Sequence, residues 1–169
     1  MKAEIITIGD ELLIGQTVDT NSAWIGKEIT VLGFTITRKI TIQDDKNSIL
    51  KTLSESLERS NLVLITGGLG PTKDDITKHT LCEYFGTELV FNQQAYNNTE
   101  QFVLARNGVM NENNKSQGML PESCTMIPNN NGTASGMWFE KEGKVVVSMP
   151  GVPHELEQMM SETSLDKIK

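Results

Sequence analysis

Short apolar runs alternate along this chain with segments in which apolar residues recur at helical spacing, and this alternation restricts the possible folds more than any other feature. In order, the first predicted strands and helices cover residues 3–8, 20–33, 34–42, 44–57, 61–66 and 75–86. A strand followed by a helix, repeated several times, is typical of an α/β fold with largely parallel strands. We therefore predict a three-layer α/β/α sandwich around a mostly parallel, mixed sheet, built as a single domain over residues 1–169.

The second half of the chain continues this pattern less regularly. The remaining predicted elements are a strand at 88–91, a polar helix at 92–108, an Asn-rich and partly helical stretch at 110–121, strands at 124–128, 136–140 and 144–150, and a helix at 153–165. A turn at Glu142–Gly143 joins the last two strands as a hairpin. One of the large side chains Trp138 or Phe139 is expected to stay partly uncovered on so small a sheet unless a second copy packs there.

Charge and hydropathy exclude two classes of partner. The formal net charge is −7, the sequence pI is about 4.9, and no run of Lys or Arg is present, which argues against binding to nucleic acid. No apolar stretch approaches the length of roughly 18 residues that a membrane span needs. The N-terminal segment reaches Gly9–Asp10 too early for the apolar part of a signal peptide, so a cytoplasmic location is expected.

The stretch LVLITGGLGPTKDDIT, residues 62–77, combines three glycines with two acidic side chains. Glycines after a strand allow positive φ and let the backbone approach a phosphate, although this stretch is neither a Walker A loop nor a G-x-G-x-x-G motif. Carboxylates beside a phosphate would repel it unless a divalent cation lies between them. We therefore predict a site for a metal-complexed phosphate or pyrophosphate. Asp74 and Asp75 are the candidate metal ligands, and the candidates for contacting the phosphate are Gly67, Gly68, Gly70 and Lys73.

Other polar residues also follow predicted strands. In an open α/β sheet the loops that leave the carboxyl ends of parallel strands line one crevice, so four loops are expected to meet. Asp10, Asn21, Asp44 and Gly151 belong to these loops and are further candidates for contacting the nucleotide, with Asp44 also a candidate metal ligand. Several of the acidic and amide side chains have a simpler interpretation as helix N-caps, and this alternative covers Asp19, Asn21, Asp45 and Asp74.

Four ordered motifs stand out along this chain: TIGDELLIGQTVDTNSAWIGKEITVLGF, TGGLGPTKDDIT, LPESCTMIPNNNGTASG and MPGVPHE. Together they resemble the N-terminal domain of the competence/damage-inducible CinA family. The resemblance covers essentially the whole chain. It implies the molybdopterin-binding fold, which is shared with molybdopterin adenylyltransferases, and assembly into a dimer or trimer. The family usually reads GTAPG where this chain has GTASG, so Ser135 puts the rigidity of that loop in doubt. Many family members also carry a C-terminal amidase domain, which is absent from these residues.

For activity, the resemblance implies hydrolysis of a nucleotide pyrophosphate, above all of ADP-ribose to AMP and ribose 5-phosphate, with Mg, Mn or Co as the cation. It assigns the acidic positions to Asp44 and Asp75, and the phosphate-facing backbone to Gly67, Gly68, Gly70 and Gly151. The residues themselves provide no partnered nucleophile, which favours direct attack by water, oriented or deprotonated by an aspartate. Two alternatives stay open: transfer of an adenylyl group to molybdopterin, and a non-catalytic module that binds a nucleotide or molybdopterin.

Overall fold

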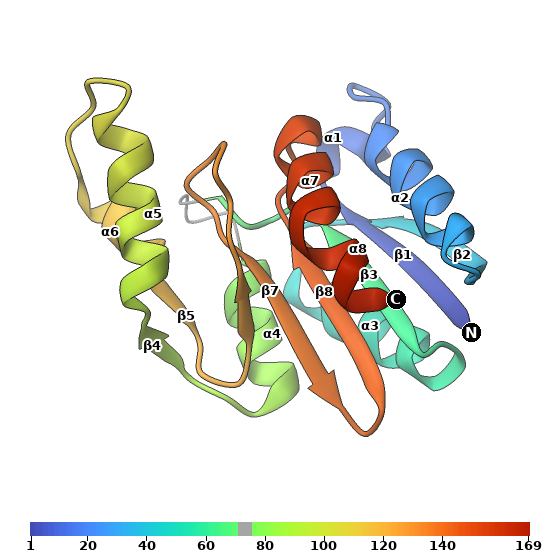
Figure 1. The fold of residues 1–169 in the computed structure, drawn as a ribbon. Helices are drawn as coiled ribbons and strands as arrows, with labels where there is room; N and C mark the ends of the chain where they lie inside the picture. The colour runs from blue at the N-terminus through green and yellow to red at the C-terminus, as the bar shows by residue number, and fades with distance from the viewer. Residues whose placement is uncertain (71–75) are drawn as a thin grey trace.

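The computed structural model describes residues 1–70 and 76–169 (Figure 1). In this part of the chain, a six-stranded sheet has the order β2-β1-β3-β8-β7-β6, in which β2, β1, β3 and β8 are parallel and β7 and β6 are antiparallel to their neighbours. The predicted mixed, mostly parallel sheet is confirmed. Its strands are β1 (Lys2–Ile8), β2 (Thr35–Ile42), β3 (Leu62–Thr66), β6 (Thr125–Ile127), β7 (Gly136–Lys141) and β8 (Lys144–Met149).

Helices cover both faces of this sheet, which gives the predicted three layers (Figure 1). One face packs against α3 and α4, and the other against α2 and the C-terminal helices. The helices are α1 (Asp10–Leu13), α2 (Thr20–Val31), α3 (Lys46–Arg59), α4 (Thr77–Phe85), α5 (Gln93–Leu104), α6 (Glu112–Ser116), α7 (Pro153–Met159), a π-helical turn (Met160–Ser164) and α8 (Leu165–Ile168).

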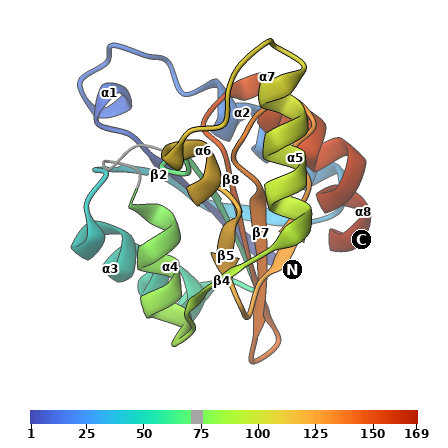
Figure 2. The same cartoon turned by 90° about the vertical axis from the view of Figure 1, so that its left-hand side faces the viewer.

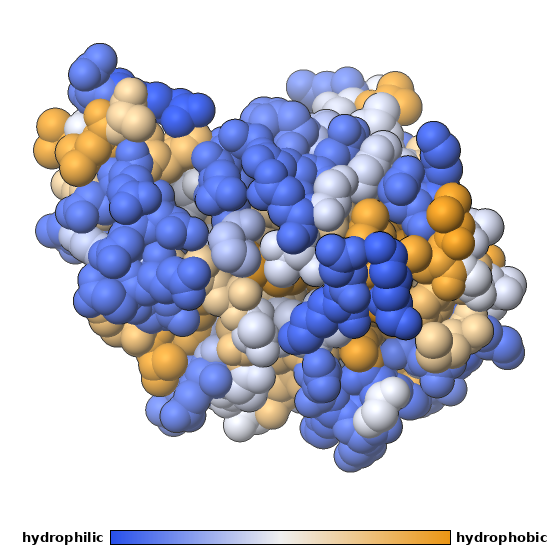
Figure 3. Space-filling view, in the orientation of Figure 1, coloured by the Kyte–Doolittle hydropathy of each residue, from blue (hydrophilic) through white to orange (hydrophobic). Residues whose placement is uncertain are grey.

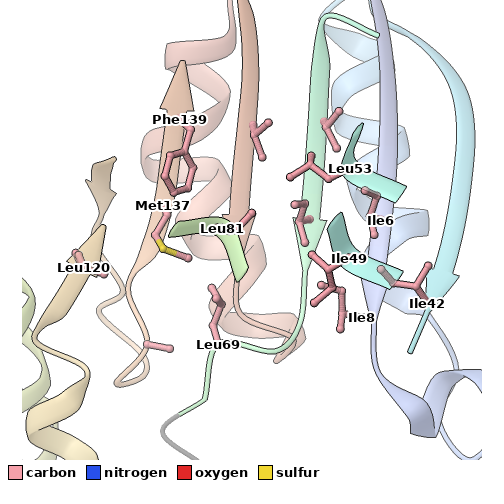
Figure 4. Close-up of a cluster of buried hydrophobic side chains, with 14 of the residues drawn as sticks. Ile6, Ile8, Ile42, Ile49, Leu53, Leu69, Leu81, Leu120, Met137 and Phe139 are labelled. Carbon is pink, nitrogen blue, oxygen red and sulfur yellow. The ribbon is translucent and has the colours of Figure 1, made fainter. Parts of the chain in front are cut away.

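The central strands are apolar on both sides because both of their faces are covered. In β1, Ile6 and Ile8 point into the core cluster under α3 and α4, whereas Ala3 and Ile5 point into the cluster under α2 and α7. Figure 4 shows the first of these clusters, in which Leu69 of the glycine loop packs with the sheet residues. The loop after β3 is therefore tied to the core by its leucine.

A small second sheet departs from the prediction. Strand β4 (Leu89–Phe91) pairs antiparallel with β5 (Met119–Pro121), although residues 110–121 were predicted to be only partly helical with no strand. The partial helix is present as α6, directly before β5. Figure 1 shows the small sheet and α5 together at the left-hand end of the molecule, and Figure 2 looks onto that end, where β5 contacts α4. This arrangement brings the end of α6 close to the glycine loop.

The expectation that Trp138 or Phe139 stays partly uncovered is wrong. Trp138 is 4% exposed and Phe139 is 1% exposed within the single chain. The Lys167 ammonium lies 4.2 Å from the centroid of the Trp138 ring, and the Phe139 ring stacks on Phe85 with centroids 4.2 Å apart. The C-terminal helix and α4 thus supply the cover that was assigned to a second copy.

The surface drawn in Figure 3 is largely hydrophilic, with hydrophobic residues in separate small groups. Within residues 1–70 and 76–169, every helix is too short or too polar to pass through a bilayer.

A buried carboxylate on β1 makes the stability of this fold dependent on pH. Glu4 is 1% exposed, and Arg59 at the end of α3 donates to it from Nε and Nη2 at 3.0 and 3.1 Å. Burial alone would raise the pKa of Glu4, but the hydrogen bonds and charge of Arg59, together with contributions from Ser56 and Arg38, outweigh it, so the pKa is lowered.

This lowered pKa predicts an acid-labile contribution to stability. Because the folded pKa lies below the unfolded one, the stabilisation is complete above the normal carboxyl pKa of about 4.3 and is lost as the pH falls through the lowered value. Urea unfolding of wild type and Glu4→Gln between pH 7 and pH 3 should therefore show a difference in unfolding free energy that shrinks on acidification. A difference that stays constant over this range would contradict the assignment.

Candidate functional site

The carboxyl ends of the four parallel strands meet at the upper edge of the sheet in Figure 1. Ile8 of β1 pairs with Ile42 of β2, and Thr66 of β3 pairs with Met149 of β8. The register continues into the loops, where the Gly67 amide donates to the Met149 carbonyl at 3.1 Å. The loops after all four strands therefore converge at one place, as expected for an open α/β sheet.

An open cleft of about 560 Å³ lies between these loops. Five of the candidate residues line it: Asp44, Gly67, Gly68, Gly70 and Gly151. The other lining residues are Ile8, Gly9, Glu11, Leu69, Thr133, Ala134, Pro150, Val152, Pro153 and Glu155. Asp10 is exposed in the first turn of α1 and is not part of this lining, whereas its neighbour Glu11 is. The candidates Lys73, Asp74 and Asp75 lie outside the described residues.

The hydrogen bonds of the glycine loop show which way its backbone amides point. The Gly68 carbonyl accepts from the Thr77 amide at 3.3 Å, and the Leu69 carbonyl accepts from Gln117 Nε2 at 3.1 Å. In a trans peptide the N–H points opposite to the carbonyl, so the amides of Leu69 and Gly70 point away from these partners. Within residues 1–70 and 76–169, the amides of Gly68, Leu69 and Gly70 donate to no acceptor. Consecutive free amides of this kind bind anions.

Glycine is required at two of these positions by geometry. Gly67 has φ +110°, and a Cβ there would lie 2.2 Å from the Ile8 carbonyl oxygen. Gly68 has φ +66°, and a Cβ there would lie 2.1 Å from Thr77 Oγ1. Residues with side chains cannot occupy these positions without displacing the loop from the sheet.

Three described carboxylates line the same cleft: Asp44, Glu11 and Glu155. Asp44 Oδ1 would lie 3.4 Å from a Cβ built on Gly68, which places this carboxylate beside the glycine loop. Among the described residues, no three Asp, Glu, His or Cys side chains are grouped closely enough to hold a metal ion by themselves. Mg²⁺ commonly uses one or two carboxylates and completes its shell with phosphate oxygens and water. The position of Asp44 beside the glycine loop fits a cation that is shared in this way between one carboxylate and a bound phosphate.

Glu155 was not among the residues predicted for the site, although it belongs to the MPGVPHE motif. The loop at 129–135 holds it: Asn129 Nδ2 donates to Glu155 Oε2 at 2.7 Å and to the Ala134 carbonyl at 2.9 Å. Ser135 in this loop is 4% exposed. The Asn129 hydrogen bonds thus fasten the loop that contains Ser135 to α7.

Asn21, at the start of α2, links this helix to the end of β3 and to the loop after β8. Its Nδ2 donates to Thr66 Oγ1 at 3.0 Å and to the Gly151 carbonyl at 2.8 Å. Asn21 also lines a smaller cavity of about 110 Å³, which shares Glu11 and Gly151 with the main cleft. The structure therefore places Asn21 beside the cleft, where it fixes the loops.

Two of the aspartates serve as helix caps, as their simpler interpretation predicted. Asp19 Oδ1 accepts from the Ser22 amide at 2.9 Å at the start of α2. Asp45 Oδ2 accepts from the Ser48 amide at 2.8 Å at the start of α3, and hydrogen bonding by Ser48 lowers the pKa of Asp45. Asp44 and Asp45 are thus neighbours in sequence with separate surroundings.

The two cysteines are not activated as nucleophiles. Burial raises the pKa of the Cys124 thiol to about 11 and also raises the pKa of Cys82. A thiol acts as a nucleophile only as its thiolate, which a raised pKa disfavours. Both thiols are therefore mostly protonated at neutral pH.

Comparison with known proteins identifies the family. The sequence profile described as "Probable molybdopterin binding domain" matches residues 4–169. A CinA-like protein of Cytophaga hutchinsonii is 49% identical over 99% of this chain, which spans 40% of that relative's length. The crystal structure of CinA from Thermoplasma acidophilum, a protein of unknown function, superposes with a TM-score of 0.88 at 34% identity, and the match covers 98% of this chain and 96% of that one.

A more distant structure shares only the fold. It is the tungsten cofactor synthesizing protein MoaB of Pyrococcus furiosus, with a TM-score of 0.65 at 21% identity over 99% of this chain and 92% of that one. The matched profile and the close relatives agree with the motifs quoted above. The chain therefore belongs to the family of probable molybdopterin binding domains and, within it, to the CinA-like proteins.

Proposed function

We propose that the cleft binds the phosphate or pyrophosphate group of a nucleotide or a molybdopterin-type ligand. The observation that supports this proposal most directly is that, within the described residues, the amides of Gly68, Leu69 and Gly70 donate to no acceptor, whereas the Gly68 and Leu69 carbonyls accept hydrogen bonds on the opposite side of the backbone. Such amides favour an oxyanion without any charged side chain. Membership of a family described as molybdopterin binding agrees with a ligand of this kind.

Hydrolysis of ADP-ribose to AMP and ribose 5-phosphate is a second proposed function of the same cleft. It is favoured by the carboxylates Asp44, Glu11 and Glu155, which line the cleft together with the glycine loop. A divalent cation bound there would neutralise charge on the phosphate oxygens and polarise the phosphorus. Asp44 would hold this cation or orient the attacking water, and the loop amides would hold the pyrophosphate.

Two further properties stay proposals. Self-association as a dimer or trimer rests on the resemblance to the CinA family alone, because Trp138 and Phe139 are covered within the chain. Action in the cytoplasm is likewise a prediction from the sequence.

Binding and turnover can be measured in one series. We expect inorganic pyrophosphate to bind in metal-free buffer, with an affinity that falls as salt is raised, by isothermal titration calorimetry. ADP-ribose is then incubated with Mg²⁺, Mn²⁺ or Co²⁺, and with EDTA, and the products are separated by chromatography.

The products distinguish the candidate functions. Free AMP formed only with a metal supports hydrolysis, whereas AMP found on an added pterin supports adenylyl transfer. Binding of pyrophosphate and ADP-ribose without any product supports a binding module. If neither pyrophosphate nor ADP-ribose binds, the proposed phosphate site is refuted.

A further inference from the structure

Two buried polar side chains, joined by hydrogen bonds, connect the glycine loop to α4 and to the end of α6. Gln117, directly after α6, is 1% exposed, and its Nε2 donates to the Leu69 carbonyl at 3.1 Å. Lys78 on α4 is 9% exposed, and its Nζ donates to Gln117 Oε1 at 3.1 Å. Lys78 Nζ also lies 3.5 Å from the Ser116 carbonyl oxygen. The side-chain amide of Gln117 thus contacts Leu69, which lies 48 positions earlier in the chain, and Lys78 at the same time.

Lys78 determines which way this amide faces. An ammonium group only donates hydrogen bonds, so the atom of Gln117 that faces Lys78 must be the oxygen. The NH₂ group of Gln117 is then left to face the Leu69 carbonyl, which only accepts. The orientation of the amide is therefore fixed by the chemistry of its two partners.

The hydrogen bond from Gln117 to the Leu69 carbonyl restricts the direction of one backbone amide in the glycine loop. The Leu69 carbonyl and the Gly70 N–H belong to one planar peptide unit, so holding the carbonyl behind the loop holds the N–H on the opposite side. The Leu69 side chain is 2% exposed and packs in the core cluster shown in Figure 4. Gln117 and the core together fix the backbone at the one residue between the two glycines, Gly68 and Gly70.

We propose that Gln117 is a positioning residue that orients the Leu69–Gly70 peptide for binding of the ligand's phosphate, with Lys78 orienting Gln117 in turn. This inference rests on the proposed phosphate-binding function. A free glycine loop samples many backbone conformations, and ordering it on binding lowers affinity. Holding the loop in its binding conformation beforehand removes part of that loss. Neither side chain needs to touch the ligand for this effect.

The test replaces Gln117 with Met, which is similar in length and makes neither hydrogen bond. We expect the affinity of the full chain for inorganic pyrophosphate, measured in metal-free buffer, to fall roughly tenfold. The ¹⁵N relaxation order parameters of the Leu69 and Gly70 amides should fall in the ligand-free variant. Gln117→Glu should show the same loss of order, because its carboxylate still accepts from Lys78 but cannot donate to Leu69.

Ile29→Val is the matched control, because Ile29 is fully buried in the other core cluster, away from the glycine loop. It should lower the melting temperature without changing pyrophosphate affinity or loop order. If Gln117→Met behaves like this control, with unchanged affinity and unchanged order at Leu69 and Gly70, the positioning role is refuted. If wild type does not bind pyrophosphate, the proposed function fails, while the order parameters still decide whether Gln117 orients the loop.

Discussion

Replacing Gly67 with Ala is expected to lower the unfolding free energy by about 3 kcal/mol or more and to abolish binding of pyrophosphate. A Cβ at this position would lie 2.2 Å from the Ile8 carbonyl oxygen, and φ is +110°. The atom in the way belongs to the backbone of Ile8 and not to a flexible side chain. The end of β1 and the start of the glycine loop would therefore both have to move. Urea unfolding and calorimetric titration with pyrophosphate measure the two effects.

Two other glycines provide controls for this prediction. Gly143 has φ +75° with open space around its Cβ position, so Gly143→Ala tests the cost of positive φ alone, about 1 kcal/mol. At Gly151 a Cβ would lie 3.4 Å from Gly67 Cα, so Gly151→Ala should destabilise the fold far less than Gly67→Ala. If Gly67→Ala is no more destabilising than Gly143→Ala, the close approach of the loop to β1 is not a constraint on the fold.

The sequence predicted the central part of the fold because its signals are local. The apolar runs of β1 and β3 and the periodic helices between them indicate parallel strands without any knowledge of tertiary contacts. Strand β5 was missed because it has only three residues, Met119–Pro121, and depends on pairing with β4. The burial of Trp138 was also missed, since it depends on Lys167 at the far end of the chain. Contacts between distant segments leave no periodic pattern to detect.

The same distinction applies to the candidate site. The glycines and Asp44 follow strands directly, so the topology of a parallel sheet was enough to bring them together. Gln117 lies in a segment that carries no site motif, and only the three-dimensional structure reveals its hydrogen bond to the Leu69 carbonyl. Asn21 was predicted to contact the nucleotide, but its hydrogen bonds to Thr66 and Gly151 also give it a role in holding the loops.

On the proposed hydrolase function, replacing Asp44 with Asn should reduce turnover of ADP-ribose about 100- to 1000-fold, or raise the activation free energy by roughly 3–4 kcal/mol. Asn keeps the shape of the side chain beside Gly68 but removes the charge that a cation would require. The loss should appear mainly in kcat, because the charge on the phosphate oxygens is greatest in the transition state. Asp75, the second acidic position implied by the family, lies outside the described residues and is predicted to respond in the same direction.

Asp45→Asn is a control one residue away. Asp45 caps α3 through the Ser48 amide, and Asn caps a helix about as well as Asp, so both stability and turnover should stay near the wild-type values. In metal-free buffer, Asp44→Asn should bind pyrophosphate as well as wild type or better, because repulsion between carboxylate and phosphate is reduced. Added Mg²⁺ should then strengthen pyrophosphate binding less in Asp44→Asn than in wild type. Equal turnover and an equal response to Mg²⁺ in the two proteins would show that Asp44 neither holds a cation nor takes part in the reaction.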